Sequence, residues 1–396
     1  MKEIIILLPG PFLKRDYERF GIETLKKNFL VKAIDCTSWT HPELWKEYFK
    51  IVFKCKEHVV ISCKKDFLTL LSQINSAIVI DSLHGDKKTN WMRQQIKKNK
   101  KNLFVELRLN LIPYPRSNII EISRKLFNLV LKPKEFISKI VKVLEQKYYN
   151  LRKSIPDINI VGCLVGKKKS KAKNNVNAHC MDYDIYLGIK NKPVSNNNSY
   201  AVFLDEGMSY HSDYFIPALG DGKPPVSEEE YYPLLVKFLN KFEMETKLSV
   251  LFAIHPKTPN HIIEKFPNLL QGIKYQIGNT AELVRDSNVV LLHQSTSFSF
   301  AVLFNKPAVF LTSNKLRNSW IGPRIDNLAK ILNGKVINMN NDLNKPLDLQ
   351  NLLKIDDNKY KNYLDQYLKV PNSPDIPLWE IFTDFIKKNH SKSIIK

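Results

Sequence analysis

Short apolar segments of strand length alternate with longer segments of helical periodicity along most of this chain. The clearest apolar runs are EIIILLP, FLVKAID, SAIVIDSL and NLFVELRL in the first third, and YAVFL, LSVLFAI, NVVLLHQ and KPAVFLTS further on. Strands that alternate with helices favour parallel sheets covered by helices on both faces. The chain has 396 residues, enough for two such domains. We therefore predict an α/β protein with two doubly wound, Rossmann-like domains.

The predicted elements divide the chain into four parts. Residues 1–155 form a first α/β domain that closes with a helical stretch over 122–153. Residues 156–199 form a connecting segment with one strand and a basic loop. Residues 200–372 form the second domain, and the amphipathic segment 373–396 forms a C-terminal helix that we expect to pack back across the domain junction.

The chain is strongly basic, with 61 Lys and Arg against 39 Asp and Glu, a formal charge of +22. A basic protein attracts polyanions, but no zinc-finger or RNA-recognition pattern is present, so we expect no nucleic-acid partner. The densest basic runs are residues 87–101 and 167–173. We interpret the second as a solvated loop. The first predicts a helix with a basic face, which suits solvent, an anionic lipid surface or an acidic acceptor.

Cysteine usage and hydropathy argue against several classes of protein. The five cysteines form no C-x-x-C pair, which argues against a disulfide scaffold or a zinc finger and favours reduced thiols in the cytoplasm. No apolar run approaches the ~18 residues that span a bilayer. The start, MKEIIILLPGPF, has no small-residue cleavage site and is interpreted as a first strand, not as a signal peptide.

Three polar clusters in the second half each follow a predicted strand. Asp205-Glu206-Gly207 follows YAVFL, His255-Pro256 follows LSVLFAI, and Ser295-Thr296-Ser297 follows NVVLLHQ. Ligands of open α/β sheets bind beyond the carboxyl ends of the strands. We therefore interpret the three clusters as parts of one candidate site.

Each cluster has a chemical interpretation and an ordinary structural one. A carboxylate such as Asp205 can act as general base on a hydroxyl, and Glu206 points to the opposite side if the strand pleat continues. His255 can donate a hydrogen bond to a phosphate oxygen or protonate a leaving group. Hydroxyls at a helix start can bind phosphate together with the helix N–H groups. The ordinary alternatives are a turn acid, a buried histidine and a helix N-cap.

Two further sets of polar residues carry weaker signals. His211 and Asp213, in GMSYHSDYF, are expected on the acceptor side of the site. Asp182-Tyr183-Asp184 matches an Asp-x-Asp metal pattern, but it lies in MDYDIYLGI, which we interpret as a short strand with solvated acids. No metal site is therefore predicted.

In their order and strand-end context, the three clusters resemble the acidic pair with Gly, the HP pair and the Ser-Ser/Thr pair of bacterial sialyltransferases. They are also similar to transferases of pseudaminic, legionaminic and Kdo-type sugars. The resemblance covers about 30% of the chain, roughly residues 200–315. It implies the GT-B architecture, in which an N-terminal acceptor-binding domain and a C-terminal nucleotide-sugar-binding domain face a central cleft.

The resemblance also implies an activity. The protein would be an inverting glycosyltransferase that moves a sialic-acid-like sugar, nonulosonic or Kdo-type, from its CMP-activated donor to a hydroxyl of a bacterial surface glycan such as capsule or lipopolysaccharide. Asp205 would be the base, with Glu206 as the alternative. His255, with Pro256, would contact the donor phosphate.

The Ser/Thr cluster departs from the family pattern. The resemblance places Ser295 and Thr296 on the donor phosphate, but a third hydroxyl, Ser297, leaves the register of the pair open by one residue. The turn that contains Asn279 and Thr280 is expected to line the nucleotide.

No metal or other cofactor is expected, because a monophosphate leaving group carries less charge than a diphosphate. The expected partners are the CMP-sugar and a glycan or lipid-linked acceptor. The expected location is the cytoplasm, with peripheral attachment to the anionic inner face of the cytoplasmic membrane. Three alternatives stay open: a GT-B transferase with a CDP-glycerol or UDP-sugar donor, a sugar-nucleotide epimerase of the same architecture, and a non-enzymatic basic protein that binds polyanions.

Overall fold

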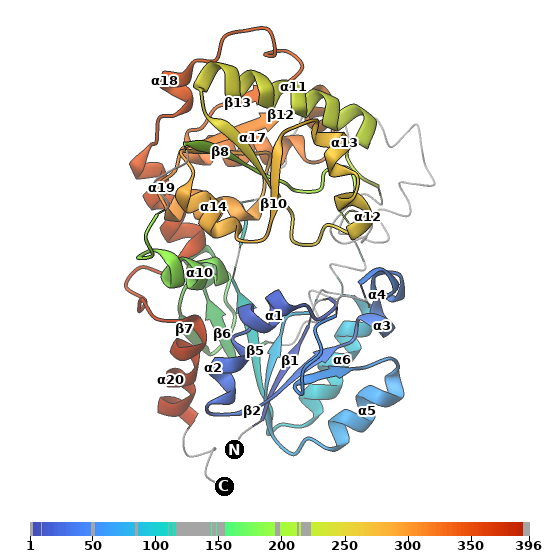
Figure 1. Cartoon of the computed structure of the whole chain (residues 1–396). Coiled ribbons are helices and arrows are strands. Elements are labelled where there is room, and N and C mark those ends of the chain that lie inside the picture. Colours follow the sequence, from blue (N-terminus) through green and yellow to red (C-terminus); the bar gives the residue numbers. More distant parts are fainter. Residues whose placement is uncertain are drawn as a thin grey trace. The chain divides into compact units, whose positions relative to one another are not determined.

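The computed structural model contains two compact units (Figure 1). It describes residues 3–8, 10–48, 52–83, 86–109, 111–113, 115, 144, 148, 155–194, 199–211, 214 and 223–390. Of the described residues, unit 1 takes those within Met1–Leu109, Arg116–His179 and Asn372–Lys396, and unit 2 takes those within Asn110–Pro115 and Cys180–Pro371. The predicted helical stretch 122–153 lies outside the described residues except at Leu144 and Tyr148.

Unit 1 is built on a seven-stranded parallel sheet in the order β3-β2-β1-β4-β5-β6-β7. Its strands are β1 (Glu3–Leu7), β2 (Leu30–Asp35), β3 (His58–Val60), β4 (Ala77–Asp81), β5 (Leu103–Arg108), β6 (Ile158–Val161) and β7 (Asn174–Asn177). Every residue of β4 and β6 is buried, as in strands that helices cover on both faces.

The described helices of unit 1 differ from the predicted ones in two places. They are α1 (Lys14–Arg19), α2 (Ile22–Lys26), α3 (Thr37–Thr40), α4 (Pro42–Tyr48), α5 (Lys64–Ser72), α6 (Lys87–Lys98), α9 (Leu164–Lys168) and α20 (Leu378–His390). The segment YERFGIETLKKN has the periodicity of a single helix, which predicts one continuous helix, but the structure interrupts it at Gly21, whose φ is +53°. The pattern Thr40-His41-Pro42 predicts Thr40 as the N-cap of a helix with Pro42 in its first turn; in the structure Thr40 is the last residue of α3, and Pro42 opens α4.

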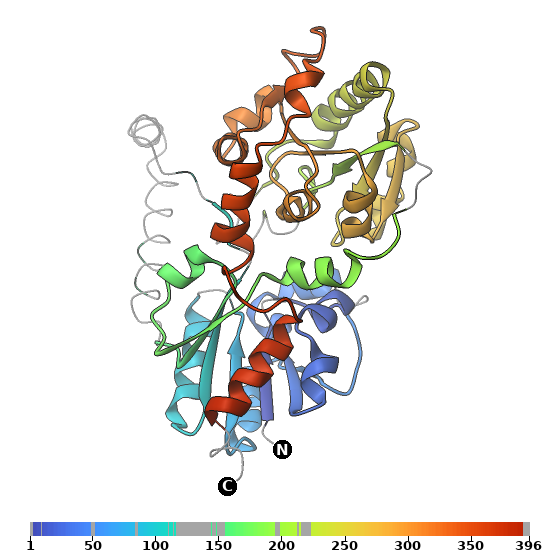
Figure 2. The ribbon, with the colours of Figure 1, turned by 90° about the vertical axis from the view of Figure 1, so that its left-hand side faces the viewer.

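The boundaries between the predicted parts also change. Because β6 and β7 complete the first sheet, the first half of the expected connecting segment, up to His179, belongs to unit 1. The C-terminal helix α20 packs on α2 of the same unit (Figure 2). Its Trp379 is buried and donates its indole N–H to the carbonyl of Arg19 at 2.8 Å. A Cβ at Gly21 would lie 2.2 Å from the Trp379 ring, so only glycine fits there.

Helix α6 carries the predicted basic run, but part of that charge points inward. Arg93 is buried and forms a two-pronged ion pair with Asp81 at the end of β4, with N–O distances of 2.6 and 3.2 Å. Lys97 donates to the carbonyl of Ile155 at 2.5 Å, and burial lowers its pKa. The exposed basic residues of the run are Lys87, Lys88, Lys98, Lys100 and Lys101.

Unit 2 is built on a six-stranded parallel sheet in the order β10-β9-β8-β11-β12-β13. Its strands are β8 (Tyr200–Leu204), β9 (Ser249–Ile254), β10 (Lys274–Ile277), β11 (Val289–Leu292), β12 (Ala308–Thr312) and β13 (Val336–Asn338). The chain runs outward from β8 to β10 and then returns to the other side of β8 to form β11. The topological switch point therefore lies between β8 and β11.

The helices of unit 2 form two layers. They are α10 (Met181–Ile189), α11 (Glu228–Thr246), α12 (Asn260–Ile263), α13 (Phe266–Leu270), α14 (Thr280–Asp286), the 3-10 turn η3 (Thr296–Phe298), α15 (Ser299–Leu303), α16 (Asn314–Asn318), α17 (Gly322–Leu332), α18 (Leu349–Leu352), α19 (Asp357–Tyr363) and the π-helical turn η4 (Leu364–Leu368). Helix α11 packs on α13, whereas α14 and α10 pack on α15. Right-handed crossovers place the two sets on opposite faces, because the strand order reverses between them.

Two predicted elements of unit 2 are wrong in type or length. MDYDIYLGI, expected as a short strand, is the helix α10. The segment STSFSFAVLFN, which we predict as one helix after β11, is a three-residue 3-10 turn followed by the five-residue α15. Within the described ranges, no helix is both long enough and apolar enough to cross a membrane.

Candidate active site

The three predicted clusters lie at the carboxyl edge of the sheet in unit 2. Asp205 and Glu206 follow β8, His255 follows β9, and Ser295 stands three residues after the end of β11. Strands β9 and β11 are the two neighbours of β8. Adjacent strands lie ~4.8 Å apart, so the three chain segments leave the sheet within about 10 Å of one another.

Asp205 binds the chain segment that follows β9. Its side chain is buried, with 3% of its surface exposed. Its Oδ1 accepts the N–H of Gly207 at 2.9 Å, and its Oδ2 accepts the hydroxyl of Tyr210 at 2.5 Å and the N–H of His255 at 3.2 Å. Burial raises the pKa of the carboxyl group, although these donors act in the opposite direction. The three hydrogen bonds hold the carboxylate in one orientation.

Tyr210 and Thr258 extend this network, and neither belongs to a motif that the sequence analysis could select. The Tyr210 hydroxyl lies 2.9 Å from that of Thr258, which donates to the carbonyl of His255 at 2.7 Å. Gly207 has a φ of +57°, and a Cβ there would lie 2.8 Å from the Tyr210 ring. The glycine of the acidic cluster is therefore needed both for its backbone conformation and for the approach of Tyr210.

Glu206 binds the segment on the other side, after β11. Its Oε1 accepts the main-chain N–H groups of His293 at 2.8 Å and Gln294 at 2.7 Å. The side chain is 9% exposed, and burial raises its pKa to about 8. The two neighbouring acids thus turn to opposite strands, and Glu206 spans the switch point itself.

His293 stabilises this arrangement from the buried interior of unit 2. The ring is fully buried, and its Nδ1 lies 2.7 Å from the carbonyl of Leu311. Because a carbonyl only accepts, Nδ1 carries the proton, and Nε2 accepts the hydroxyl of Tyr231 at 2.8 Å. Burial lowers the pKa of His293 to about 4, so the ring is neutral at physiological pH. The prediction omitted His293, although it too is a polar residue after an apolar strand.

His255 presents a hydrogen-bond donor. Its Nδ1 accepts the N–H of Lys257 at 3.2 Å, so the proton of the neutral ring is on Nε2. The ring of His211 packs edge-on against it, with centroids 4.5 Å apart. The structure therefore places His211 beside His255, the residue predicted to bind the donor phosphate. Pro256 is exposed, and Asp213 lies outside the described residues.

The Ser/Thr cluster forms the turn η3. The Oγ of Ser295 accepts the N–H of Ser297 at 3.2 Å, so Ser295 is the N-cap. Ser295 is buried, Thr296 is exposed and Ser297 is half-buried. Since the following helix is short, the N–H groups available here belong to a single turn with little dipole behind them.

The Asp-x-Asp pattern has a structural role. Asp182, expected to be solvated or at a strand edge, is buried and accepts the hydroxyl of Ser299 at 2.6 Å. This bond joins α10 to α15.

The predicted nucleotide-lining residues lie further along the same carboxyl edge. Asn279 and Thr280 follow β10, two strands from β8; Asn279 is exposed and has a φ of +53°. In the described part of the chain, no group of three or more His, Cys, Asp or Glu residues could hold a metal ion.

No protein-family model matches the chain, and no curated protein sequence matches it either. Several solved structures share its fold. The wall teichoic acid polymerase TagF has a TM-score of 0.55 at 12% identity, covering 100% of this chain and 90% of that chain. MnaA of S. aureus, solved with UDP, has a TM-score of 0.51 at 11% identity and covers 100% of this chain and 98% of that chain. A UDP-N-acetylglucosamine 2-epimerase from Listeria monocytogenes, described as putative, has a TM-score of 0.50 at 12% identity, with 98% and 97% covered.

The two parallel sheets and these neighbours define the fold as GT-B. The predicted α/β class with two Rossmann-like units is confirmed. At 11–12% identity the likeness shows the fold alone. The sialyltransferase-like family, the central cleft between the units and the roles of the site residues stay predictions.

Proposed function

We propose that this protein is an inverting glycosyltransferase that moves a sialic-acid-like sugar from a CMP-activated donor to a hydroxyl acceptor. The observation that carries the proposal is the arrangement around the switch point of unit 2. An acidic pair follows β8, and a histidine and a hydroxyl cluster follow its two neighbours, at the position where open α/β sheets bind nucleotides.

In the proposed reaction, Asp205 is the general base. Burial raises its pKa, so the carboxylate accepts a hydroxyl proton more readily than a solvated one. The acceptor oxygen attacks the anomeric carbon while the bond from that carbon to the phosphate oxygen breaks. The proton passes to Asp205, and CMP leaves with the bonding electrons. Glu206 is the alternative base, since its pKa of about 8 also suits proton transfer near neutral pH.

The leaving phosphate gains negative charge in the transition state. The Nε2–H of His255, the hydroxyls of Ser295 and Thr296 and the N–H groups of η3 are the proposed donors to that charge. Removal of one such donor typically costs ~10²–10³ in rate. This set of donors needs no metal, so we expect transfer to continue in the presence of EDTA.

A nucleotide panel tests the donor class. Purified protein is heated with CMP, CDP, UDP or GDP, and the unfolding temperature is recorded. A ligand at 100 times its Kd stabilises by ~2.7 kcal/mol, which gives a measurable shift. We expect CMP to produce the largest shift. A larger shift with CDP or UDP would contradict the proposal of a CMP-activated donor. It would favour the alternative, a GT-B transferase that uses another nucleotide-linked donor.

Transfer is then followed with CMP-Neu5Ac, CMP-pseudaminate, CMP-legionaminate and CMP-Kdo, each with and without candidate glycans. Release of CMP that depends on the glycan supports the proposal. The Asp205→Asn variant serves as the control for release that the site does not catalyse.

A second candidate is supported by the neighbours of the same fold, which include a UDP complex and a 2-epimerase. The chain would then act on a UDP- or CDP-linked substrate, either by transfer or by epimerisation. An epimerase converts the nucleotide sugar without any acceptor. NMR of the nucleotide sugar alone, incubated with the protein, separates this activity from transfer.

The proposed acceptor is a surface glycan or its lipid-linked precursor, and the proposed location is the cytoplasmic face of the membrane. The formal charge of +22 and the exposed lysines of α6 support association with an anionic surface. We expect no specific nucleic-acid binding. A gel-shift assay with duplex DNA at physiological salt checks this expectation.

A further inference from the structure

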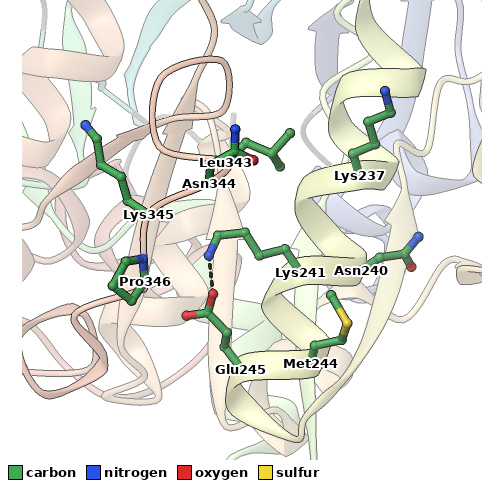
Figure 3. Close-up of a pocket in the computed structure, with 9 residues that line it drawn as sticks. All are labelled: Lys237, Asn240, Lys241, Met244, Glu245, Leu343, Asn344, Lys345 and Pro346. Carbon is green, nitrogen blue, oxygen red and sulfur yellow. Dashed lines mark hydrogen bonds and ion pairs between the residues drawn. The ribbon is translucent and has the colours of Figure 1, made fainter.

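A pocket of about 580 Å³ lies in unit 2 (Figure 3). It opens between the second half of α11 and the loop of residues 343–346. Helix α11 ends three residues before β9 begins, so its second half lies toward the amino edge of the sheet. Asp205 and His255 lie at the opposite, carboxyl edge. A ligand here would not compete with the donor.

The pocket is built around a buried lysine. Lys241 is only 8% exposed, and its ammonium group forms an ion pair with Glu245, one helical turn later. The other carboxylate oxygen of Glu245 accepts the N–H of Leu347 at 2.7 Å. This pair offsets the cost of burying the lysine and fastens the loop to the helix. The pocket is therefore a fixed part of the fold.

The lining is positively charged. Lys237 and Lys345 lie on opposite sides of the opening, with Lys241 between them (Figure 3). Glu245 is the single acid that lines this pocket, so the lining residues carry a net charge of +2 before the Asp342 carboxylate that pairs with Lys345 is counted. Lys345 also contacts Asp342, but this pair is exposed and contributes little to holding the side chain.

The same pocket exposes apolar surface. Met244 is 66% exposed, the highest value among the large apolar side chains that the structure describes. Leu343 and Pro346 line the pocket from the loop. No aromatic residue is among the lining residues, so the pocket has no surface on which a base or a sugar ring could stack.

We propose that this pocket binds the phosphate headgroup of an anionic phospholipid, with Met244 entering the adjoining acyl region. Lysines supply the attraction to the phosphate, and each one near an anionic surface increases binding roughly fivefold. The exposed methionine has a use in a bilayer, whereas a polysaccharide would leave it in water. The inference gives unit 2 a membrane contact of its own and holds whichever donor the enzyme uses.

Vesicle binding tests the inference with the full chain and no donor. The protein is sedimented with vesicles of phosphatidylcholine alone or with added phosphatidylglycerol. We expect the double variant Lys237→Glu, Lys345→Glu to lose roughly tenfold or more of its binding to the anionic vesicles. The matched control is Lys274→Glu, Lys330→Glu, which makes the same charge change at exposed lysines outside the pocket. We expect this control to stay within about twofold of the wild type.

Further measurements separate the sources of binding. Met244→Ser should weaken binding to anionic vesicles at high salt, where the lysine contribution is screened.

Three outcomes would overturn the inference. Equal losses in both double variants would mean that diffuse surface charge, and not the pocket, causes the binding. A loss confined to Lys87→Glu, Lys98→Glu would move the contact to α6. A thermal shift with inorganic phosphate but no vesicle binding would identify a free-phosphate site instead. Unfolding temperatures of all variants check that each one folds.

Discussion

The main-chain N–H of His293 donates to Oε1 of Glu206 at 2.8 Å. This bond joins the residue after β11 to the second residue after β8. It therefore crosses the topological switch point between these two strands, where the strand order reverses. Asp205 makes the corresponding bond to His255 on the other side of β8. Two consecutive acids therefore hold three strand ends together, and this arrangement decides how each one responds to substitution.

Replacement of Glu206 by Gln should change how stability depends on pH. The pKa of Glu206 rises from 4.5 to about 8 on folding. Between these values the folded protein keeps a proton that the unfolded chain has lost, so the free energy of unfolding falls as pH rises through this window. Glutamine keeps an oxygen for the two N–H donors and cannot ionise. Urea denaturation between pH 4.5 and 8 should give a flatter profile for Glu206→Gln, and parallel profiles would contradict the assignment.

Asp205→Asn should reduce turnover by ~10² or more, because a general base contributes about that much, while CMP binding is retained. The control is Tyr210→Phe, which removes one hydrogen bond to Asp205 but keeps the carboxylate. We expect this control to lose less than about tenfold. Steady-state kinetics with CMP release as the readout measures both. Full turnover in Asp205→Asn together with loss in Glu206→Gln would transfer the role of base to Glu206.

His255→Ala should lower kcat by ~10²–10³, because the Nε2–H no longer stabilises the leaving phosphate. His211 serves as the neighbouring control, since its ring packs 4.5 Å from that of His255. His211→Phe keeps the ring contact and removes the ring nitrogens. Initial rates at saturating donor should show a much smaller loss for His211→Phe. Equal losses would mean that the pair acts through packing.

His293 should make the protein sensitive to acid. Its pKa falls from 6.5 to about 4 on folding because the ring is buried. Between pH 6.5 and about 4, His293 is therefore protonated in the unfolded chain but stays neutral in the folded protein. The free energy of unfolding consequently falls as the pH drops through this window. His293→Gln should flatten this part of the profile even if its stability near neutrality is lower. Tyr231→Phe keeps the buried ring and should retain the slope.

Gly207→Ala should destabilise the protein more than a matched glycine change. Gly207 has a φ of +57°, and a Cβ there would meet the Tyr210 ring at 2.8 Å. Gly278 also has a positive φ, +79°, but nothing lies within 4 Å of its Cβ position. Gly278→Ala should therefore cost only the backbone strain, ~1–2 kcal/mol. Chemical denaturation compares the two, and equal costs would show that Tyr210 moves aside freely.

Much of the fold follows from local pattern. Strands such as β4 and β8 are buried along their whole length, so their apolar runs are visible in the sequence. Helix α10 was not predictable in this way, because MDYDIYLGI alternates acidic with apolar residues as a strand does. Its Asp182 is buried against Ser299, a partner 117 residues away. The close approach of the Trp379 ring to Gly21 likewise joins positions far apart in the chain, which local periodicity does not register.

The candidate site was predictable as a set of residues but not as a network. Polar residues after apolar strands identified Asp205, Glu206 and His255. Which neighbour each acid binds depends on the order β9-β8-β11, and this order is fixed by long-range pairing. Tyr210 and Thr258 are ordinary loop residues in the sequence, and only the fold brings their hydroxyls to 2.9 Å.

Unit 1 is completed by a segment that comes late in the chain. Its Trp379 fills the space above Gly21, yet all of Cys180–Pro371 is translated between β7 and α20. During synthesis on the ribosome, unit 1 is therefore completed after unit 2. The apolar surface around Gly21 that α20 covers stays exposed until the end of the chain has been made. A chain interrupted anywhere within unit 2 lacks this indole and offers that surface to chaperones and proteases, so prematurely terminated copies should be cleared rather than accumulate.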